Sequence, residues 1–429
     1  MNLKILSLKG ILMLAFFFVV VTNGCRTETS SEKQMDVDTV TTDGAWCWFS
    51  DPRAVYHEGT KKQTYTGYVT RQGDVVVAAY DHSTGTWQEH VIHPGFEADD
   101  HDNPALMVRK DGRLMVCYSG HSHGPMYCVV SKQPGEITAW RPAVTFGEKV
   151  TYAVPLACGD STLLFYRGIG WHPTLVVSTD EGDSWGTPQQ FIRGGGARPY
   201  TKYVADSKGR VHVAFTHGHP RKESRNRIYY ACFDHGLFRR ADGTPIKAWR
   251  GTDDALDIDR DPLDTVYDAS AGKGWIWDIA LDDAGRPVMV YAAFPSDTTH
   301  TYHYARWNGD QWENHFICEG GSWFPQTPAG ATEREPNYSG GLALDHGDAS
   351  VVYLSRPAEG VFEIFRYHTP DGGVSWHHEA VTSGTAQGTL NVRPFVPRNA
   401  PGKEVEVLWM QGTYRHYRDY RTGILFAGK

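Results

Sequence analysis

The sequence lacks three features that would each indicate a particular class of protein. After residue 40 it shows no amphipathic helical periodicity of any length, which argues against a helical fold. Its apolar segment at Ile11–Val21 is too short to span a membrane as a stable helix. It also has no basic excess, because 42 Lys and Arg against 50 Asp and Glu give a net charge of −8. That charge argues against a nucleic-acid binder but still permits an anionic substrate, which needs only a local cluster of Arg and His.

Cysteine is scarce, with seven residues in 429 and no C-x-x-C pair. Six of them lie in apolar or aromatic surroundings: Cys47, Cys117, Cys128, Cys158, Cys232 and Cys318. An exported protein could form disulfides, but this pattern is more typical of buried core thiols than of a disulfide framework.

What the chain does contain is strand-forming sequence. It is 40% hydrophobic and 13% aromatic, with 14 Trp and 22 Tyr, which suits a globular protein with a sizeable core. Short alternating or apolar runs are separated by Gly, Asp, Asn and Pro. Together these features predict an all-β fold, and the aromatic content is also common in sugar-binding clefts.

The first 24 residues have the features of a signal peptide. Lys4 and Lys9 give a basic start, an apolar run follows, and Thr22 to Cys25 end it. A small residue followed by Cys resembles the lipobox of bacterial lipoproteins, so we predict cleavage before Cys25 and lipidation of its thiol. The alternative is ordinary secretion that leaves Cys25 as a free thiol.

The remaining chain divides into two predicted parts. Residues 25–40 are polar and would serve as a flexible tether, and residues 41–429 would form one catalytic domain. Export would place the protein in the periplasm or at the cell surface. The lipid on Cys25 would then be its only attachment to a membrane.

A repeat of about fifty residues runs through the predicted domain. Its first strands are expected to begin near Pro52, Pro104, Tyr152, Pro199, Trp275, Tyr338 and Val392. Most are followed by a polar turn and a second strand, as in KDGRLMVCY and DDAGRPVMVY. A four-stranded unit of this size is typical of a propeller blade, so the repeat predicts a seven-bladed β-propeller. A pair of β-sandwiches is the strand-rich alternative, but the sequence shows no linker between two halves.

Two segments fit the S-x-D-x-G-x-x-W pattern of the Asp-box, also called the BNR repeat. Residues 178–185 match it fully, and residues 369–376 match it with Thr in place of Ser. Such boxes mark turns between blade strands and carry no chemistry themselves.

The clearest site signal lies in residues 99–123. Two apolar runs joined by an Asp-Gly turn at residues 110–113 predict a hairpin, and a hairpin brings its outer ends together. His101 and His121 should therefore lie side by side on one rim. Asp99, Asp100, Asp102 and His123 crowd the same rim.

Two imidazoles among carboxylates form a candidate acid/base site, because His titrates near neutral pH and a carboxylate fixes its tautomer. Each His alone could be a loop cap or a polar residue at a strand end. The pairing of His101 with His121 favours a functional site.

Several motifs now resemble one family. They are DGAWCWFSDPRA at 43–54, DDHDNP at 99–104, SGH at 119–121, TY at 151–152, FYRG at 165–168, RPYTKY at 198–203 and HGHPR at 217–221. This set is similar to the BNR-repeat propellers of carbohydrate-active enzymes, which include ulvan lyases and enzymes that cleave L-rhamnose-α-1,4-D-glucuronate in arabinogalactan. The resemblance covers nearly all of the mature chain and implies a seven-bladed propeller.

The resemblance also implies a lyase site. Its catalytic residues would be His101, His121, Tyr152 in TYAVP and Arg167 in FYRG, and its substrate contacts would be Arg221, His123, Tyr203 and Arg198. The C5 proton of a uronate becomes acidic once cationic groups neutralise the carboxylate. A base then removes that proton while Tyr152 donates one to the leaving O4. Related lyases usually have Asn at Val154 and Asp at His217, and these two differences argue against an ulvan-type polymer lyase.

A second branch of the same resemblance consists of hydrolases, glycoside hydrolase family 145, which remove terminal L-rhamnose from glucuronate with a single His on the opposite face. His57, at the end of the predicted strand PRAVYH, is the candidate for that role. An exposed turn histidine is an equally reasonable reading of His57.

The predicted chemistry requires no cofactor. His219, Cys232 and His235 are loosely spaced candidates for a structural zinc, because related lyases carry one nearby. The sequence does not assign a metal.

Three hypotheses remain. The first is β-elimination that splits terminal L-rhamnose from O4 of D-glucuronate, and the second is hydrolysis of the same linkage through His57. The third is a non-catalytic glycan-binding propeller. In each case the partner is a uronate-containing polysaccharide or oligosaccharide. Elimination is favoured because its site can be built from the hairpin geometry.

Overall fold

The computed structural model describes residues 35–195, 198–322, 326–328, 330–332, 335–400 and 404–428. The predicted signal peptide, Cys25 and the tether up to residue 34 lie outside the described residues and stay predictions. Among the residues that are described, no helix is both long enough and apolar enough to cross a membrane.

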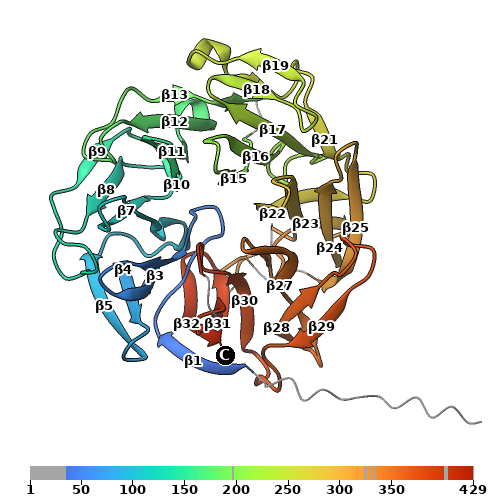
Figure 1. The fold of residues 1–429 in the computed structure, drawn as a ribbon. Coiled ribbons are helices and arrows are strands. Elements are labelled where there is room, and N and C mark those ends of the chain that lie inside the picture. The colour runs from blue at the N-terminus through green and yellow to red at the C-terminus, as the bar shows by residue number, and fades with distance from the viewer. Residues whose placement is uncertain are drawn as a thin grey trace, which may run out of the picture. The chain divides into compact units, whose positions relative to one another are not determined.

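From Met35 onward the chain forms a ring of seven antiparallel sheets, which confirms the predicted all-β, seven-bladed propeller (Figure 1). Blade 1 consists of β2 (Ala54–Glu58), β3 (Lys62–Val69), β4 (Val75–Asp81) and β5 (Thr86–His93). Blade 2 consists of β6 (Ala105–Val108), β7 (Leu114–Ser119), β8 (Met126–Val130) and β9 (Val144–Phe146), preceded by the short 3₁₀ turn η1 (Asp100–Asp102). Blade 3 consists of β10 (Thr151–Cys158), β11 (Ser161–Arg167), β12 (Pro173–Ser178) and β13 (Gln189–Gln190), with η2 (Ile169–Trp171) between β11 and β12.

Blade 4 is the most elaborate. It contains β15 (Thr201–Ala205), β16 (Val211–Thr216), β17 (Ile228–Asp234), β18 (Leu237–Arg239) and β19 (Pro245–Ala248), and β21 (Asp264–Tyr267) also pairs with β17. A parallel pair, β14 (Ile192–Arg193) and β20 (Leu256–Asp257), lies beside it, and η3 (Thr252–Asp254) precedes β20.

Blades 5 to 7 complete the ring. Blade 5 is β22 (Lys273–Leu281), β23 (Pro287–Ser296), β24 (Thr299–Trp307) and β25 (Trp312–Gly321). Blade 6 is β26 (Leu342–Asp345), β27 (Asp348–Ala358), β28 (Val361–His368) and β29 (His377–Ala380). Blade 7 is β30 (Leu390–Phe395), β31 (Val407–His416), β32 (Asp419–Gly428) and β1 (Asp36–Thr41). All seven predicted blade starts lie within a few residues of the innermost strand of their blade.

The N-terminal strand closes the ring, which corrects the predicted tether. Asp36 pairs with Gly428 and Thr39 with Leu425, so residues 36–40 belong to the propeller. Their side chains are mostly exposed, as expected of an edge strand, and the strand is held by backbone pairing. A polar edge strand of this kind has the composition of a tether, and composition alone therefore misassigned it.

The hairpin predicted from residues 99–123 is β6–β7. The backbone N of Arg109 donates to the carbonyl of Arg113 (2.9 Å), and Gly112 takes the left-handed conformation (φ +79°) that this turn requires. Ala105 pairs with Cys117, so the two outer ends of the hairpin meet at the same edge of the blade.

The Asp-boxes form the predicted turns between β12 and β13 and between β28 and β29. In the first, Gly182 N donates to Ser178 Oγ (2.7 Å) and Ser184 N donates to Asp180 Oδ1 (2.8 Å). The second repeats this pattern with Thr369 as the hydroxyl acceptor.

An aromatic segment fills the centre of the ring. After β1 the chain runs into the middle of the propeller (Figure 1), where Trp46 and Trp48 are buried. Trp48 stacks on Trp277 with ring centroids 4.3 Å apart and meets Trp275 edge-on at 5.0 Å. This packing fixes the loop that bears Cys47 at the centre of the ring.

Each innermost strand begins at one face of the ring and ends at the other. We call the face where β2, β6, β10, β15, β22, β26 and β30 begin the entry face, and the face where they end the exit face. Each face has a cavity at its centre.

Candidate active site

The entry-face cavity has a volume of about 470 Å³ and collects side chains from several blades. His101 and His121 come from the two ends of the β6–β7 hairpin, and Tyr152 comes from β10. The other lining residues used below are Cys47, Arg198, Tyr200, His219, Arg221, Lys222, Glu335 and Tyr417. The predicted juxtaposition of His101, His121 and Tyr152 is therefore confirmed, while their catalytic role stays a prediction.

Asp99 anchors both histidines. His101 Nδ1 donates to Asp99 Oδ1 (2.7 Å), and His121 Nδ1 donates to Asp99 Oδ2 (3.1 Å). Asp99 also caps η1 by accepting from the backbone N of His101 (3.0 Å). Burial would raise the pKa of this carboxyl, but His101 and His121 outweigh it and hold that pKa well below its usual range. A single carboxylate thus fixes the orientation and tautomer of two imidazoles.

The two imidazole rings are stacked, with centroids 3.8 Å apart and planes 11° apart. Tyr417 meets both rings edge-on, at 5.0 Å from His101 and 5.3 Å from His121. Stacked rings this close cannot both carry a positive charge at low cost, so protonation of one disfavours protonation of the other.

The surroundings of the two rings decide which one is charged. Burial would lower the pKa of His101, but Cys47, Asp99 and Asp100 outweigh it and hold that pKa well above its ordinary value. Burial, together with the charge on His101, lowers the pKa of His121 to about 4. At neutral pH the pair therefore consists of a cationic His101 and a neutral His121.

Tyr152 reaches the cavity through a β-bulge. The register of β10 against β11 shifts between Thr151 and Val154, and Tyr152 has φ +66°, an unusual value for a residue with a side chain. Its ring lies 5.7 Å from that of His101. Burial raises the pKa of the Tyr152 hydroxyl well above its ordinary value, although Arg167 opposes this, so the group stays protonated.

Arg167, which the sequence predicted as a catalytic residue, packs against Tyr152 and does not line the cavity. Its guanidinium packs 4.5 Å from the Tyr152 ring centre and donates to Ser122 Oγ (3.2 Å) and Tyr200 Oη (3.4 Å). The side chains that line the cavity instead include the cations Arg198, Arg221 and Lys222. Arg198 covers the Trp171 ring at 4.4 Å.

Arg221 and His219 share one acidic partner. Arg221 Nε lies 3.3 Å from Glu335 Oε2, and His219 Nε2 lies 3.6 Å from the same oxygen. Burial, followed by the charge of Arg221, lowers the pKa of His219 to about 3, so this imidazole is neutral. Arg221 therefore provides the positive charge on this side of the cavity.

Two predicted substrate contacts lie elsewhere. Tyr203 stacks on Phe165 (4.2 Å) and lines the exit-face cavity, because it lies within β15, whereas Tyr200 precedes this strand and lines the entry-face cavity in its place. His123 is 60% exposed and pairs with Glu97 (2.6 Å) outside the cavity. The loop between β7 and β8 turns away from the cavity after His121. The short sequence spacing between His121 and His123 did not reveal this turn.

The exit-face cavity has a volume of about 680 Å³ and is lined by His57 at the end of β2. Lys202, His346 and Arg398 line it as well. His57 therefore lies on the face away from His101, as the strand order predicted.

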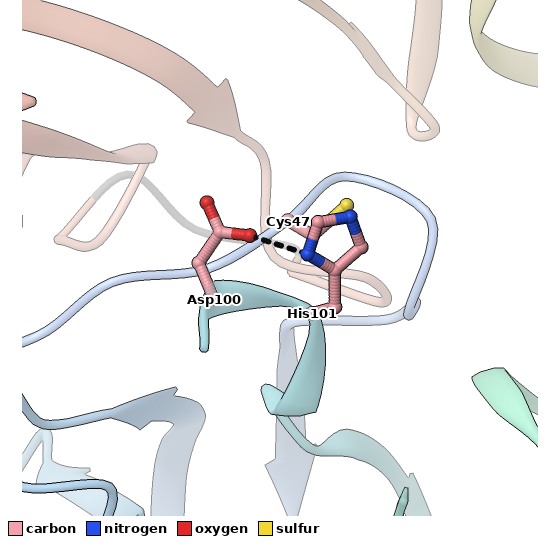
Figure 2. A group of neighbouring side chains, drawn as sticks. All are labelled: Cys47, Asp100 and His101. Carbon is pink, nitrogen blue, oxygen red and sulfur yellow. Dashed lines mark ion pairs between the residues drawn. The ribbon is translucent and has the colours of Figure 1, made fainter. Parts of the chain in front are cut away.

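Two clusters of described residues have ligand atoms close enough to hold a metal ion: Cys47, Asp100 and His101, and Asp99, His101 and His121. Figure 2 shows the first, with the Asp100 carboxylate directed at a ring nitrogen of His101. The predicted zinc set is not among these clusters. His219 lines the entry-face cavity, Cys232 is buried within β17, and His235 lies on the exposed β17–β18 turn.

Sequence reasoning missed the contribution of blade 7. Tyr417 packs on both histidines, and the neighbouring Arg418 Nε donates to Asp99 Oδ2 (2.9 Å). Both residues lie at the β31–β32 turn, more than 300 residues from Asp99, and only closure of the ring brings them here. Cys47 and Tyr200 stand in motifs that the sequence singled out, but neither was assigned a role.

The cavity thus holds a neutral imidazole able to accept a proton, a protonated phenol able to donate one, and cations able to bind an anionic group. Such a set can remove a proton next to a carboxylate and protonate a leaving oxygen on the same substrate.

Comparison with known proteins gives a consistent picture. The sequence profile described as a BNR repeat-containing family member matches residues 63–319. A PL25 ulvan lyase of Pseudoalteromonas sp. (strain PLSV) is 23% identical over 321 residues, which cover 61% of this chain and 62% of that protein. An ulvan lyase of Alteromonas sp. (strain LOR) is 26% identical over 170 residues, 33% of this chain and 34% of that protein. The matches therefore span less than two thirds of the length of either relative.

Solved structures show the same fold. A PL25 ulvan lyase bound to -[GlcA(1-4)Rha3S]- superposes with a TM-score of 0.69 at 15% identity, covering 91% of this chain and 95% of the other. Polysaccharide lyase Uly1 superposes with a TM-score of 0.56 at 13% identity, covering 92% and 99%. At these identities the likeness concerns the architecture of the propeller.

Proposed function

Because the chain belongs to the BNR repeat-containing family, we propose that it is a polysaccharide lyase of the ulvan lyase type. The observation that carries this proposal is the Asp99-anchored pair of histidines in one cavity with Tyr152. We propose further that the bond it breaks joins L-rhamnose to O4 of D-glucuronate in glycans such as arabinogalactan.

The reaction follows from the charge states of the site. His121, neutral and held through Nδ1, accepts the C5 proton of the uronate at Nε2. The electron pair of that C–H bond forms the C4=C5 double bond as the C4–O4 bond breaks, and Tyr152 donates its proton to the departing oxygen. Cationic His101 and Arg221 stabilise the carboxylate and the charge that develops on it.

The family resemblance predicts Asn at Val154 and Asp at His217, and both positions lie outside this cavity. Val154 lines the exit-face cavity, and His217 Nε2 lies 3.5 Å from Asp259 without lining the entry-face cavity. These two positions therefore do not exclude ulvan as a substrate, and the test includes it.

The test is to incubate the protein with a rhamnosyl-α-1,4-glucuronate disaccharide and, separately, with ulvan. Ultraviolet absorbance of the new C4=C5 bond and free rhamnose are both followed. Absorbance with rhamnose release from the disaccharide is the expected result. Absorbance from ulvan alone would keep the lyase and overturn terminal rhamnose of arabinogalactan-type glycans as its substrate. Binding of either glycan without turnover would indicate a non-catalytic propeller and overturn the proposal.

Hydrolysis is the second candidate, because His57 lines a separate cavity with its own cations on the exit face. It would release rhamnose without new absorbance, and His57→Ala would abolish that release. If elimination occurs at the entry face, His57→Ala should leave it unchanged.

Arg221→Ala should raise KM about tenfold or more while changing kcat little. Arg221 lines the cavity with its charge, and a hydrogen bond to a charged group contributes about 1.5–3 kcal/mol. The matched control is Arg225→Ala, which removes an exposed arginine four residues away that bonds the Asp268 carbonyl. An equal rise in KM for both variants would show that Arg221 acts only through the overall charge of the protein.

A further inference from the structure

Asp100 links the catalytic pair to blade 7. It is buried between Asp99 and His101 in η1, and its Oδ1 lies 3.0 Å from His101 Nδ1 (Figure 2). Its Oδ2 accepts from Arg393 Nη1 (2.5 Å) and from the Tyr414 hydroxyl. Each oxygen of this carboxylate therefore faces a different partner.

Arg393 comes from β30 in blade 7, and its guanidinium makes hydrogen bonds and ring contacts on several sides. Nη1 also donates to the Trp46 carbonyl (2.6 Å), and Nη2 donates to the Tyr414 hydroxyl (2.9 Å). The guanidinium carbon lies 4.5 Å from the Tyr414 ring centre and 5.2 Å from that of Trp48. Arg393 has φ +55° within an irregular stretch of β30, and strain of this kind persists only where the surroundings over-determine it.

The negative charges of Asp99 and Asp100 explain why a buried arginine lies at this position. Asp99 and Asp100 are adjacent buried carboxylates, and without a cation one of them would take up a proton. Burial opposes ionisation of Asp100, but Arg393 and then His101 outweigh it, so the pKa of Asp100 stays below its usual value. Two ionised carboxylates then face His101, whereas His121 bonds only Asp99.

The titratable and charged groups around His101, among the described residues, come from six parts of the chain. They are Asp99, Asp100 and Asp102 in η1 and its N-cap, Cys47 of the central loop, His121 after β7, Tyr152 of β10, His219 after β16, and His416, Tyr417 and Arg418 around the β31–β32 turn. Arg393 contacts this group by hydrogen-bonding Asp100, and its charge also acts on Cys47.

We propose that Arg393, together with Tyr414, is a positioning residue: by holding Asp100 in place it decides which of the two stacked histidines carries the proton. This inference rests on the proposed function for its role in turnover, but the position of the proton can be measured without a substrate.

The experiment is an NMR pH titration of the protein labelled at histidine Cε1, with the His121 signal assigned by its loss in His121→Ala. Wild-type His121 should titrate near pH 4. In Arg393→Met, and in Arg393→Gln, which keeps hydrogen-bond donors, the midpoint should rise by about one pH unit or more, because Asp100 then takes up a proton and no longer favours the charge on His101. A folded Arg393 variant that keeps the wild-type midpoint would overturn the proposal.

Three further variants sharpen the result. Asp100→Asn with Arg393→Met removes the arginine and the carboxylate through which it is proposed to act, so the midpoint should match that of Arg393→Met alone. Tyr414→Phe keeps the charge of Arg393 and removes one hydrogen bond to Asp100, so the midpoint should rise, but by less than in Arg393→Met. Arg53→Met removes an equally buried arginine that pairs with Asp51, and it should leave the midpoint unchanged.

The two proposals can fail separately. If the wild-type protein makes no unsaturated uronate but the midpoint moves in Arg393→Met, elimination is wrong and the control of the proton by Arg393 stands. If product forms and the midpoint does not move, the inference about Arg393 alone is wrong.

Discussion

Replacing His121 with Ala is expected to lower kcat/KM for elimination by roughly 10³- to 10⁴-fold, near the upper end of what one acid/base group contributes. His121 is the neutral member of the stacked pair, and Asp99 holds its Nδ1, which leaves Nε2 to accept the C5 proton. Alanine removes this acceptor and leaves Asp99 bonded to His101 and Arg418. The rate of appearance of unsaturated uronate, measured on a variant with wild-type Tm, checks the expectation.

The acid limb of the wild-type pH profile supports the same assignment. A base works only when unprotonated, so activity should persist above the lowered pKa of His121, about 4, and fall as the pH drops through it. A histidine with its ordinary pKa would lose activity about two units higher.

His123→Ala is the matched control for this variant. It removes an exposed histidine two residues away that bonds Glu97 and does not line the cavity. Its rate should stay within about twofold of wild type, since exposed ion pairs contribute little. If His121→Ala keeps more than a tenth of the wild-type rate, or if the two variants lose activity equally, His121 is not the base.

The hairpin shows how far local sequence could locate this site. The Asp-Gly turn and the two apolar runs fix the β6–β7 register, and that register alone brings His101 and His121 to the same edge. Their contact at 3.8 Å and their unequal charges do not follow from it. Those depend on Asp99 between the rings and on burial under the rest of the ring.

Long-range closure explains what the sequence could not show. Arg393, Tyr414, Tyr417 and Arg418 belong to blade 7, and they meet η1 only because β1 pairs with β32 and completes the circle. The number of sequence repeats predicted a ring of seven blades. It did not predict which side chains would face the centre of that ring. The same limit applies to Tyr203: the family motif located the segment correctly, but Tyr200, just before β15, lines the entry-face cavity and Tyr203, within β15, lines the exit-face cavity.

Replacing Tyr152 with Phe is expected to lower kcat by about 10²- to 10⁴-fold with little change in KM. Phenylalanine keeps the ring, which packs against Phe49 and beneath Arg167, and removes only the hydroxyl. That hydroxyl is protonated at neutral pH because burial raises its pKa, so it can serve as the acid for the departing oxygen. Steady-state rates on the rhamnosyl-glucuronate disaccharide measure the effect.

The leaving group separates this role from a structural one. A glucuronate that carries an acidic phenol at O4 needs no protonation as it departs, so Tyr152→Phe should slow its elimination far less than that of the rhamnoside. Tyr203→Phe is the matched control, because Tyr203 is a buried tyrosine that lines the exit-face cavity. Equal slowing of both substrates by Tyr152→Phe would show that the hydroxyl positions the substrate. A smaller loss on the phenolic substrate would instead identify Tyr152 as the proton donor, because only the step that protonates the oxygen has become unnecessary.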